Sequence, residues 1–443
     1  MRGGVDKVRA GRRIRRPAAR SSRRGFGYVG VTLAGALAAA GLAACGTSSA
    51  ATGPVTLNFY MFPDPSGAIQ QAVNSCSAQS HGKYTISYNL LPTAADQQRL
   101  QMARRLAAGD SSLDILGLDV TWEAEFATAG WIRPWTGAFK QQAIAGTLKG
   151  PLNTAIWHGQ LVAVPANSNT QLLWYRSDLV KTPPKTWAQM ISDAEQLAKQ
   201  GKPHLIQIQG AQYEGTVVWF NTLTVSAGGS ILNPASTAAK LGPPAVKALS
   251  IMKQLATSSA ADPSLPVQTE GPNQLAMEAG TSAFELNYPL VYPAMKIDNP
   301  KLFKVFKWAP YPSVYPGKPA RVTVGGIDYA ISSTSQHAQL AFQAALCLRN
   351  AANQLTAAVK GGLPPTLASV YNNPQMQSAY PFRKLILQQV NFGSVRPKTP
   401  LYQVVSVAIS HQVSPPSSIN PVSTEQNMRT QINNALSGKG LTP

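Results

Sequence analysis

From residue 55 onward, hydrophobic and polar residues alternate with two periods, about 2 residues as in strands and about 3.6 residues as in helices. Three stretches have the apolar content or period-two alternation of strands: Val55–Phe62, Tyr84–Leu91 and Leu113–Val120. Between them, apolar residues over positions 69–76 recur at helical spacing, and Asp96–Gly109 is a helical pattern closed by glycine. The resulting order, strand–helix–strand–helix–strand, predicts an α/β lobe built on a parallel sheet.

The same patterns continue further along the chain. Thr186–Gly201 begins with Thr186 and Gln189 at the spacing of a capping box and ends at glycine, which predicts a helix. Thr281–Pro289 is typical of a strand that ends at a proline turn, and Gln339–Ala352 of a second helix. These elements indicate a second α/β unit after the first.

The N-terminal region has the pattern of an export signal. A basic segment, 1–24, precedes an apolar stretch, Phe26–Ala44, and the pair Arg23-Arg24 indicates the twin-arginine route. The sequence Leu42–Cys45 resembles the lipobox of bacterial lipoproteins, which implies cleavage before Cys45, its acylation, and anchoring to the outer face of the cytoplasmic membrane. Residues 45–54 would form a flexible tether. The alternative is a cysteine that falls by chance beside an ordinary cleavage site.

Removing the leader changes the charge of the protein. The 443 residues hold 39 Lys and Arg against 19 Asp and Glu, but ten of the basic residues and one aspartate lie in positions 1–44. The exported part therefore has 29 basic and 18 acidic residues, with no basic stripe, which argues against nucleic-acid binding. About 400 residues suggest two domains or lobes.

Two cysteines remain once Cys45 is assigned to lipid. In an oxidising envelope, Cys76 and Cys347 suggest one disulfide, and they would meet if their helices cover the same lobe. Two buried free thiols are the alternative.

Catalytic and metal-binding patterns are missing from the sequence. The five histidines are isolated, without the spacing that zinc needs, and neither a nucleophile elbow nor a phosphate-binding loop occurs. No cofactor is expected. A tethered, aromatic-rich protein of this kind is predicted to bind a ligand and not to be an enzyme. The alternative is a carbohydrate hydrolase, whose two opposed catalytic carboxylates need no recognisable sequence motif.

Four segments together resemble the family 1 extracellular solute-binding proteins of sugar ABC importers. In chain order they are Leu113–Trp135, Val162–Val180, Pro183–Met190 and Asn273–Pro289. The resemblance implies a two-lobed, periplasmic-binding-protein-like α/β fold with the ligand cleft between lobes joined by hinge strands. It places lobe 1 at residues 55–165 and 310–352, and lobe 2 at residues 166–309 and 353–443. Hinge crossings are expected near Val164–Ala166, Trp308–Pro312 and Ala352.

Within that family the chain is most similar to the trehalose-binding lipoproteins of mycobacterial importers. The segments that carry this likeness are "RLQMARRL", "WFNTLTVSAGGSIL", "GGLPP" and "VRPKTPLYQ". The likeness implies a monomer that binds trehalose or a similar disaccharide and delivers it to permease subunits driven by a separate ATPase. Tyr288 stands where tryptophan is expected, and residues 296–306 are shorter than expected, so another disaccharide or oligosaccharide stays open.

The resemblance also assigns the ligand-binding residues. They are Gln98, Asp119, Asn169, Glu270, Tyr288, Gly326, Ile327 and Arg396. Carboxylates would accept hydrogen bonds from sugar hydroxyls, the guanidinium would donate them, and the tyrosine would stack on a sugar ring. We therefore expect Asp119→Ala and Arg396→Ala to abolish binding while the melting temperature of the empty protein stays nearly unchanged.

Each assignment has a structural alternative. Asp119 is suited to cap a following turn, and Asn169 is a common turn residue. Glu270, Arg396 and Gln98 could be solvated at the surface, and Tyr288 could pack in the core.

Overall fold

The computed structural model describes residues 53–439. Its first sheet contains the first three strands of the chain together with two later ones. This sheet has five strands in the order β2-β1-β3-β11-β6, and β1 pairs in parallel with β2 and β3. Strand β11 runs antiparallel to its neighbours β3 and β6. The bounds are β1 (Val55–Met61), β2 (Tyr84–Leu90), β3 (Ile115–Asp119), β6 (Val164–Asn169) and β11 (Gly325–Ile331). The predicted parallel arrangement is therefore confirmed for β1, β2 and β3, and a later segment completes the sheet in the opposite direction.

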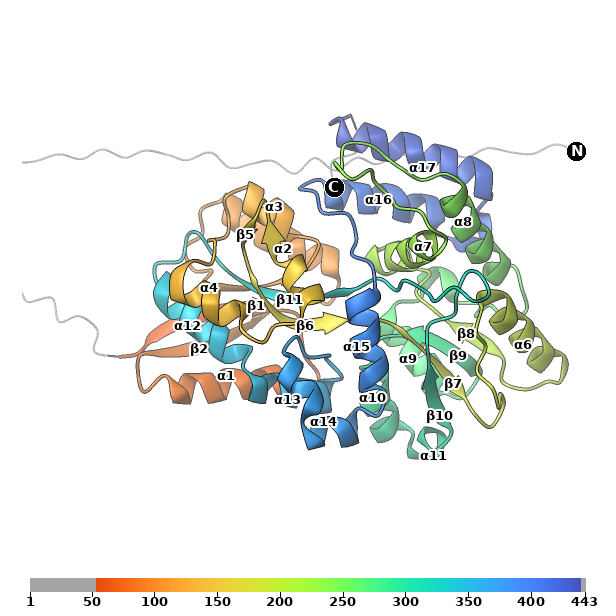
Figure 1. The fold of residues 1–443 in the computed structure, drawn as a ribbon, viewed down its shortest axis with the longest axis horizontal. Coiled ribbons are helices and arrows are strands. Elements are labelled where there is room, and N and C mark those ends of the chain that lie inside the picture. Colours follow the sequence, from red (N-terminus) through yellow and green to blue (C-terminus); the bar gives the residue numbers. More distant parts are fainter. Residues whose placement is uncertain (1–52, 440–443) are drawn as a thin grey trace, which may run out of the picture. The chain divides into compact units, whose positions relative to one another are not determined.

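A second sheet of four strands forms a separate group, which Figure 1 shows apart from the first. Its order is β10-β7-β9-β8, and only the β8–β9 pair is parallel. The bounds are β7 (Leu172–Arg176), β8 (Leu205–Gln207), β9 (Ser282–Asn287) and β10 (Phe306–Ala309). A small hairpin pairs β4 (Ile156–Trp157) with β5 (Gln160–Leu161).

The chain passes between the two sheets at two connections. Residues 170–171 join β6 to β7, and residues 310–324 join β10 to β11. The first connection lies a few residues beyond the crossing expected at Val164–Ala166, because those residues belong to β6. The sequence-based division into lobes is kept as a proposal. The predicted leader, tether start and acylated Cys45 lie outside the described residues.

Three hydrophobic cores hold the helices against these sheets. The first core contains residues of α1 (Ala68–Gln79), α2 (Ala95–Ala107), α3 (Glu123–Thr128), α4 (Gly137–Ile144) and α12 (Ala338–Leu348). The second contains residues of α6 (Trp187–Lys199), α7 (Glu214–Ser226), α8 (Pro243–Ala256), α16 (Tyr402–Val413) and α17 (Pro421–Leu436). The third contains residues of α9 (Glu270–Glu278), α10 (Val291–Asp298), α13 (Ala351–Gly361), α14 (Pro374–Ala379) and α15 (Arg383–Phe392).

The remaining helical segments are short. They are α5 (Lys149–Thr154), α11 (Pro300–Phe303) and the 3₁₀ turns Leu265–Val267, Ala368–Asn372 and Pro416–Ser418. Over residues 53–439, no helix combines the length and apolar character needed to cross a membrane.

Helix α6 shows how local sequence sets an element. The Thr186 hydroxyl accepts a hydrogen bond from the Gln189 backbone N–H at 3.1 Å, as the predicted cap requires. The Gln189 side chain does not return to Thr186, because its Oε1 accepts from the Lys185 N–H at 3.0 Å instead. The predicted cap by the Thr186 hydroxyl is therefore confirmed, but the Gln189 side chain bonds the backbone N–H of Lys185 in place of that of Thr186.

A disulfide joins Cys76 of α1 to Cys347 of α12. Both helices pack on the first core, and Cys76 is fully buried. The bond closes a loop of 271 residues, so it restricts the unfolded chain strongly.

One carboxyl group is buried in the second sheet. Glu285 of β9 lies between Trp174 of β7 and Gln207 of β8 and is 0% exposed. Burial raises the pKa of Glu285 to about 8, although a hydrogen bond from the Asn287 amide to Oε1, 2.7 Å long, favours the charged form. The folded protein thus keeps a proton that the unfolded chain loses above about pH 4.5.

This burial gives a first prediction. The stability that protonated Glu285 contributes is complete below about pH 4.5 and is lost as pH rises toward 8, at about 1.4 kcal/mol per pH unit. Glu285→Gln should remove that loss and raise the free energy of unfolding at pH 7 by about 3 kcal/mol relative to the native sequence. Urea denaturation from pH 5 to 8 measures it, with the partly exposed Glu195→Gln as control. Parallel pH profiles for Glu285→Gln and the native chain would contradict the prediction.

Candidate functional site

Arg396 joins carboxylates that come from different parts of the fold. It lies in the segment 393–401 between α15 and α16 and is 4% exposed. Its Nη2 donates to Asp119 Oδ1 at 3.1 Å, and its Nη1 donates to Glu214 Oε1 at 2.5 Å. Asp119 ends strand β3 of the first sheet, whereas Glu214 begins α7 beside the second sheet. Burial alone would lower the pKa of Arg396, but these two carboxylates raise it well above its usual value, so the guanidinium stays charged.

Asp119 is held by its own turn and keeps one side open. Its Oδ1 accepts hydrogen bonds from the Thr121 N–H at 2.9 Å and the Thr121 hydroxyl at 2.8 Å. The side chain is 21% exposed. Asp119 thus does stabilise a turn, and the same geometry leaves its carboxylate accessible to a hydroxyl donor.

Glu214 is enclosed by donors from α16. Its Oε1 accepts from the Tyr402 hydroxyl at 2.6 Å as well as from Arg396, and its Oε2 accepts from the Ser406 hydroxyl. Burial raises the pKa of Glu214, while Arg396, Ser406 and Tyr402 oppose the rise. The carboxylate is therefore saturated by protein groups and serves to hold Arg396 in place.

Glycines bring the backbone of β11 against this ion cluster. A Cβ added to Gly325 would lie 3.3 Å from Arg396 Nη2 and 3.9 Å from the Asn169 Cβ. Gly326 has φ +148°, and a Cβ there would lie 2.3 Å from the Asn167 carbonyl oxygen. No other residue fits that conformation and approach. Ile327 pairs directly with Asp119, so these strand ends form one wall of the site.

Glu270 and Tyr288 lie at the ends of elements that belong to or pack on the second sheet. Glu270 begins α9, where the Asn287 amide donates to its backbone carbonyl at 3.0 Å, and Tyr288 follows β9. Burial raises the pKa of Tyr288, the negative charge of Glu270 raises it further, and Arg396 opposes the rise. The Tyr288 hydroxyl therefore lies within range of the charges of both Glu270 and Arg396.

Tyr213 fills the space behind Glu270. Burial raises the pKa of Tyr213, and so does the neighbouring Glu270 carboxylate. Gly215 makes room for this ring, since a Cβ there would lie 2.2 Å from the Tyr213 hydroxyl oxygen. Burial also raises the pKa of Glu270 itself.

Gln98 is not joined to this cluster by any hydrogen bond among the described residues. It is 5% exposed on α2, and its amide donates to the Thr93 carbonyl at 3.2 Å. Its neighbour Asp96 accepts from the Gln403 amide of α16 at 3.0 Å, which links α2 to the second lobe. The predicted role of Gln98 as a ligand stays a prediction.

A second cation from the Arg396 segment enters the first lobe. Lys398 donates to the carbonyls of Asn153 and Ile156, the latter at 3.2 Å. It lies near two buried carboxyl groups, Glu123 and Asp328, which are 2% and 1% exposed. Burial raises the pKa of Glu123 well above its usual value, and that of Asp328 to about 6. Lys398 opposes the rise in pKa at both carboxyl groups.

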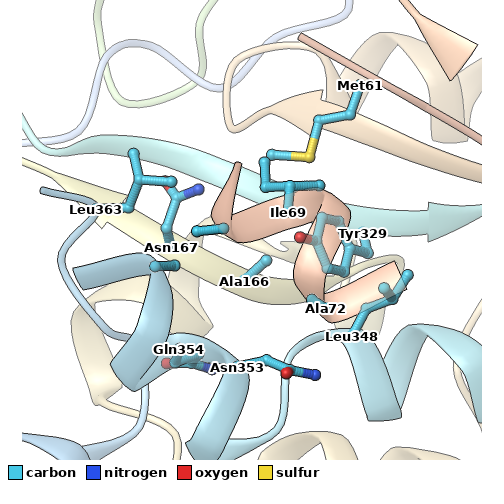
Figure 2. Close-up of a pocket in the computed structure, with 12 residues that line it drawn as sticks. Met61, Ile69, Ala72, Ala166, Asn167, Tyr329, Leu348, Asn353, Gln354 and Leu363 are labelled. Atoms are coloured by element: carbon cyan, nitrogen blue, oxygen red, sulfur yellow. The ribbon is translucent and has the colours of Figure 1, made fainter. Parts of the chain in front are cut away.

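A cavity of about 190 Å³ borders the ion cluster. Its lining includes Arg396, Lys398, Asn221 of α7 and Asn233. A separate cavity of about 20 Å³ lies between the first sheet and α13, where Figure 2 shows Tyr329, Asn167 and Gln354 around it. That volume suits one water molecule and excludes a sugar ring. Within residues 53–439, no group of three or more His, Cys, Asp or Glu side chains could hold a metal ion.

Sequence patterns did not indicate several members of the site. They are Tyr213, Glu214, Lys398, Tyr402 and Ser406. Glu214 is an acidic residue in the first turn of a helix, which is common without any ligand. Its contact with Arg396 spans 182 residues of chain, and no local pattern reports such a distance.

Residues 67–355 match the family of bacterial extracellular solute-binding proteins, and the chain belongs to that family. A probable ABC transporter-binding protein of Deinococcus radiodurans is 27% identical over 350 residues, which are 74% of this chain and 81% of that protein.

Solved structures share the fold. Maltose-bound MalE3 of T. maritima superposes with a TM-score of 0.79 at 24% identity, over 85% of this chain and 99% of that chain. The GacH receptor of Streptomyces glaucescens gives 0.75 at 21% identity, over 87% and 99%. The predicted two-lobed, periplasmic-binding-protein-like α/β fold is thereby confirmed. The narrower likeness to trehalose-binding lipoproteins stays a prediction.

The ion cluster changes one expectation for stability. Because Arg396 is buried against Glu214, Arg396→Ala would leave that buried carboxylate without its counter-charge. In contrast to the unchanged stability expected from sequence, we expect a loss of about 3 kcal/mol in the free energy of unfolding. Adding Glu214→Gln should recover part of it. Urea denaturation of the two variants measures both effects, with the exposed Arg104→Ala as control. Equal free energies of unfolding for Arg396→Ala and the native chain would show that Arg396 does not stabilise the fold.

Proposed function

We propose that this protein is the substrate-binding component of an ABC sugar importer and that it binds a disaccharide, with trehalose as the first candidate. The observation that supports this most directly is the position of Arg396. One buried guanidinium meets carboxylates from both lobes, and Asn169, Tyr288 and the strand end at Gly326 converge on the same place. The protein would perform no chemistry itself.

The residue types suit a neutral sugar. Ring hydroxyls donate and accept hydrogen bonds, while the C–H faces of a pyranose are apolar. The accessible Asp119 carboxylate would accept from a hydroxyl, and Arg396 Nε, which is buried without a partner among the described residues, would donate to one. Tyr288 would lie against a ring face. Each charge-assisted bond would contribute about 1.5–3 kcal/mol.

Names of the relatives agree with this proposal. The Deinococcus protein is described as a probable ABC transporter-binding protein, MalE3 was solved with maltose, and GacH was solved with acarbose. Export by the leader, acylation of Cys45 and anchoring to the outer face of the cytoplasmic membrane belong to the same proposal.

Isothermal titration with a panel of disaccharides tests the proposal. We expect one saturable site, and ligand at a hundred times its dissociation constant should stabilise the protein by about 2.7 kcal/mol. The same mixtures should release no monosaccharide over hours. Turnover would identify a carbohydrate hydrolase, and absence of heat and stabilisation across the panel would contradict sugar binding.

Asp119→Asn separates the binding role from the structural one. The substitution keeps the shape and removes the charge that accepts a hydroxyl, so sugar affinity should fall about 10- to 100-fold. Thermal unfolding of the empty variant should stay close to that of the native chain, because Glu214 still pairs with Arg396. The exposed Asp298→Asn is the matched control. Unchanged sugar affinity in Asp119→Asn would remove Asp119 from the site.

A further inference from the structure

A larger cavity lies at the connection between β10 and β11, apart from the Arg396 cluster. Its volume is about 620 Å³, within the range of roughly 300–1,000 Å³ that small-molecule sites occupy. Three segments line it: residues 182–185 before α6, residues 309–320 of the connection, and the C-terminal half of α15. None of the site residues discussed above lines this hinge cavity.

The walls of the hinge cavity are mainly apolar. Four prolines contribute to it, and proline has no backbone N–H to be satisfied, so these stretches of wall need no polar partner. Phe392 at the end of α15 is 51% exposed, which is unusual for a large aromatic side chain. Leu385 lies two turns before Phe392 on the same face of α15 and extends the same apolar wall.

Charge at the hinge cavity has one sign. Lys185 and Lys318 are exposed lining residues, and the lining contains no aspartate or glutamate. Arg321 adds a third cation nearby, with its guanidinium carbon 5.9 Å from the centre of the Phe392 ring. An anionic group at the rim would therefore meet only favourable charges.

One polar group in the wall lacks a partner. Tyr311 is 3% exposed, and its hydroxyl makes no hydrogen bond within the described part of the chain.

We propose that the hinge cavity binds a free small amphiphile, an apolar chain or ring with one anionic group, such as a medium-chain fatty acid. The apolar part would occupy the wall formed by Phe392, Leu385 and the prolines. The anionic group would lie at the rim with Lys185 and Lys318. This site is independent of the sugar site in its residues and in its ligand chemistry.

Two matched fluorescent probes test the proposal on the full exported chain. They are 8-anilinonaphthalene-1-sulfonate and N-phenyl-1-naphthylamine, which share an aromatic body and differ in the sulfonate. We expect the sulfonate probe to bind the native protein at one saturable site and decanoate to displace it. The double variant Lys185→Met/Lys318→Met should weaken the sulfonate probe about tenfold and leave the neutral probe unchanged.

Phe392→Ser locates the site, because Phe392 is exposed and its loss does not open a core. It should weaken both probes by at least about fivefold, whereas Lys307→Met, an exposed lysine on β10 outside the cavity, should change neither. Non-saturable binding, or binding that Phe392→Ser leaves intact, would overturn the proposal. Capture by anionic vesicles that Phe392→Ser abolishes, without displacement by decanoate, would also overturn it, since the surface would then recognise a membrane. No arm uses a sugar, so failure here is distinct from failure of the importer function.

Discussion

The arrangement of the candidate site depends on one buried cation held between two carboxylates. Arg396 is desolvated, which is costly, and the carboxylates that face it offset that cost, Glu214 through the shorter contact and Asp119 through the longer one. Asp119 comes from the end of a strand in the first sheet and Glu214 from a helix of the second lobe. The ion cluster therefore forms only when the end of β3, the start of α7 and the segment 393–401 are close together. It makes the position of each lobe sensitive to whatever binds between them.

The segment that contains Arg396 also contains Lys398, and the two cations contact different partners. Arg396 meets the accessible Asp119, whereas Lys398 reaches backbone carbonyls beside the buried Glu123 and Asp328. Water at the open side of Asp119 could be replaced by a ligand hydroxyl, whereas Lys398 keeps its hydrogen bonds to protein atoms. The segment thus combines a contact suited to a ligand with one that fixes its own position.

Local sequence was sufficient for elements whose contacts are close along the chain. The parallel strands β1, β2 and β3 follow from apolar runs, and the start of α6 follows from Thr186. Asp119 and Arg396 were indicated only through family motifs, and the structure places them in contact. Glu214 was missed because its significance comes from Arg396, Tyr402 and Ser406, all far from it in sequence. Gly326 was expected near ligand, but its need for glycine comes from the Asn167 carbonyl of a neighbouring strand.

The Nε–H of Arg396 reports directly on whether a sugar binds at this cation, because it is buried and without a partner in the described residues. Nitrogen-15 NMR of arginine side chains, with the signal assigned by its loss in Arg396→Lys, follows this group as a disaccharide is added. We expect the Arg396 signal to shift to saturation together with binding heat and its exchange with water to slow. A signal that does not move at saturating sugar would show that the ligand binds elsewhere and would contradict the account.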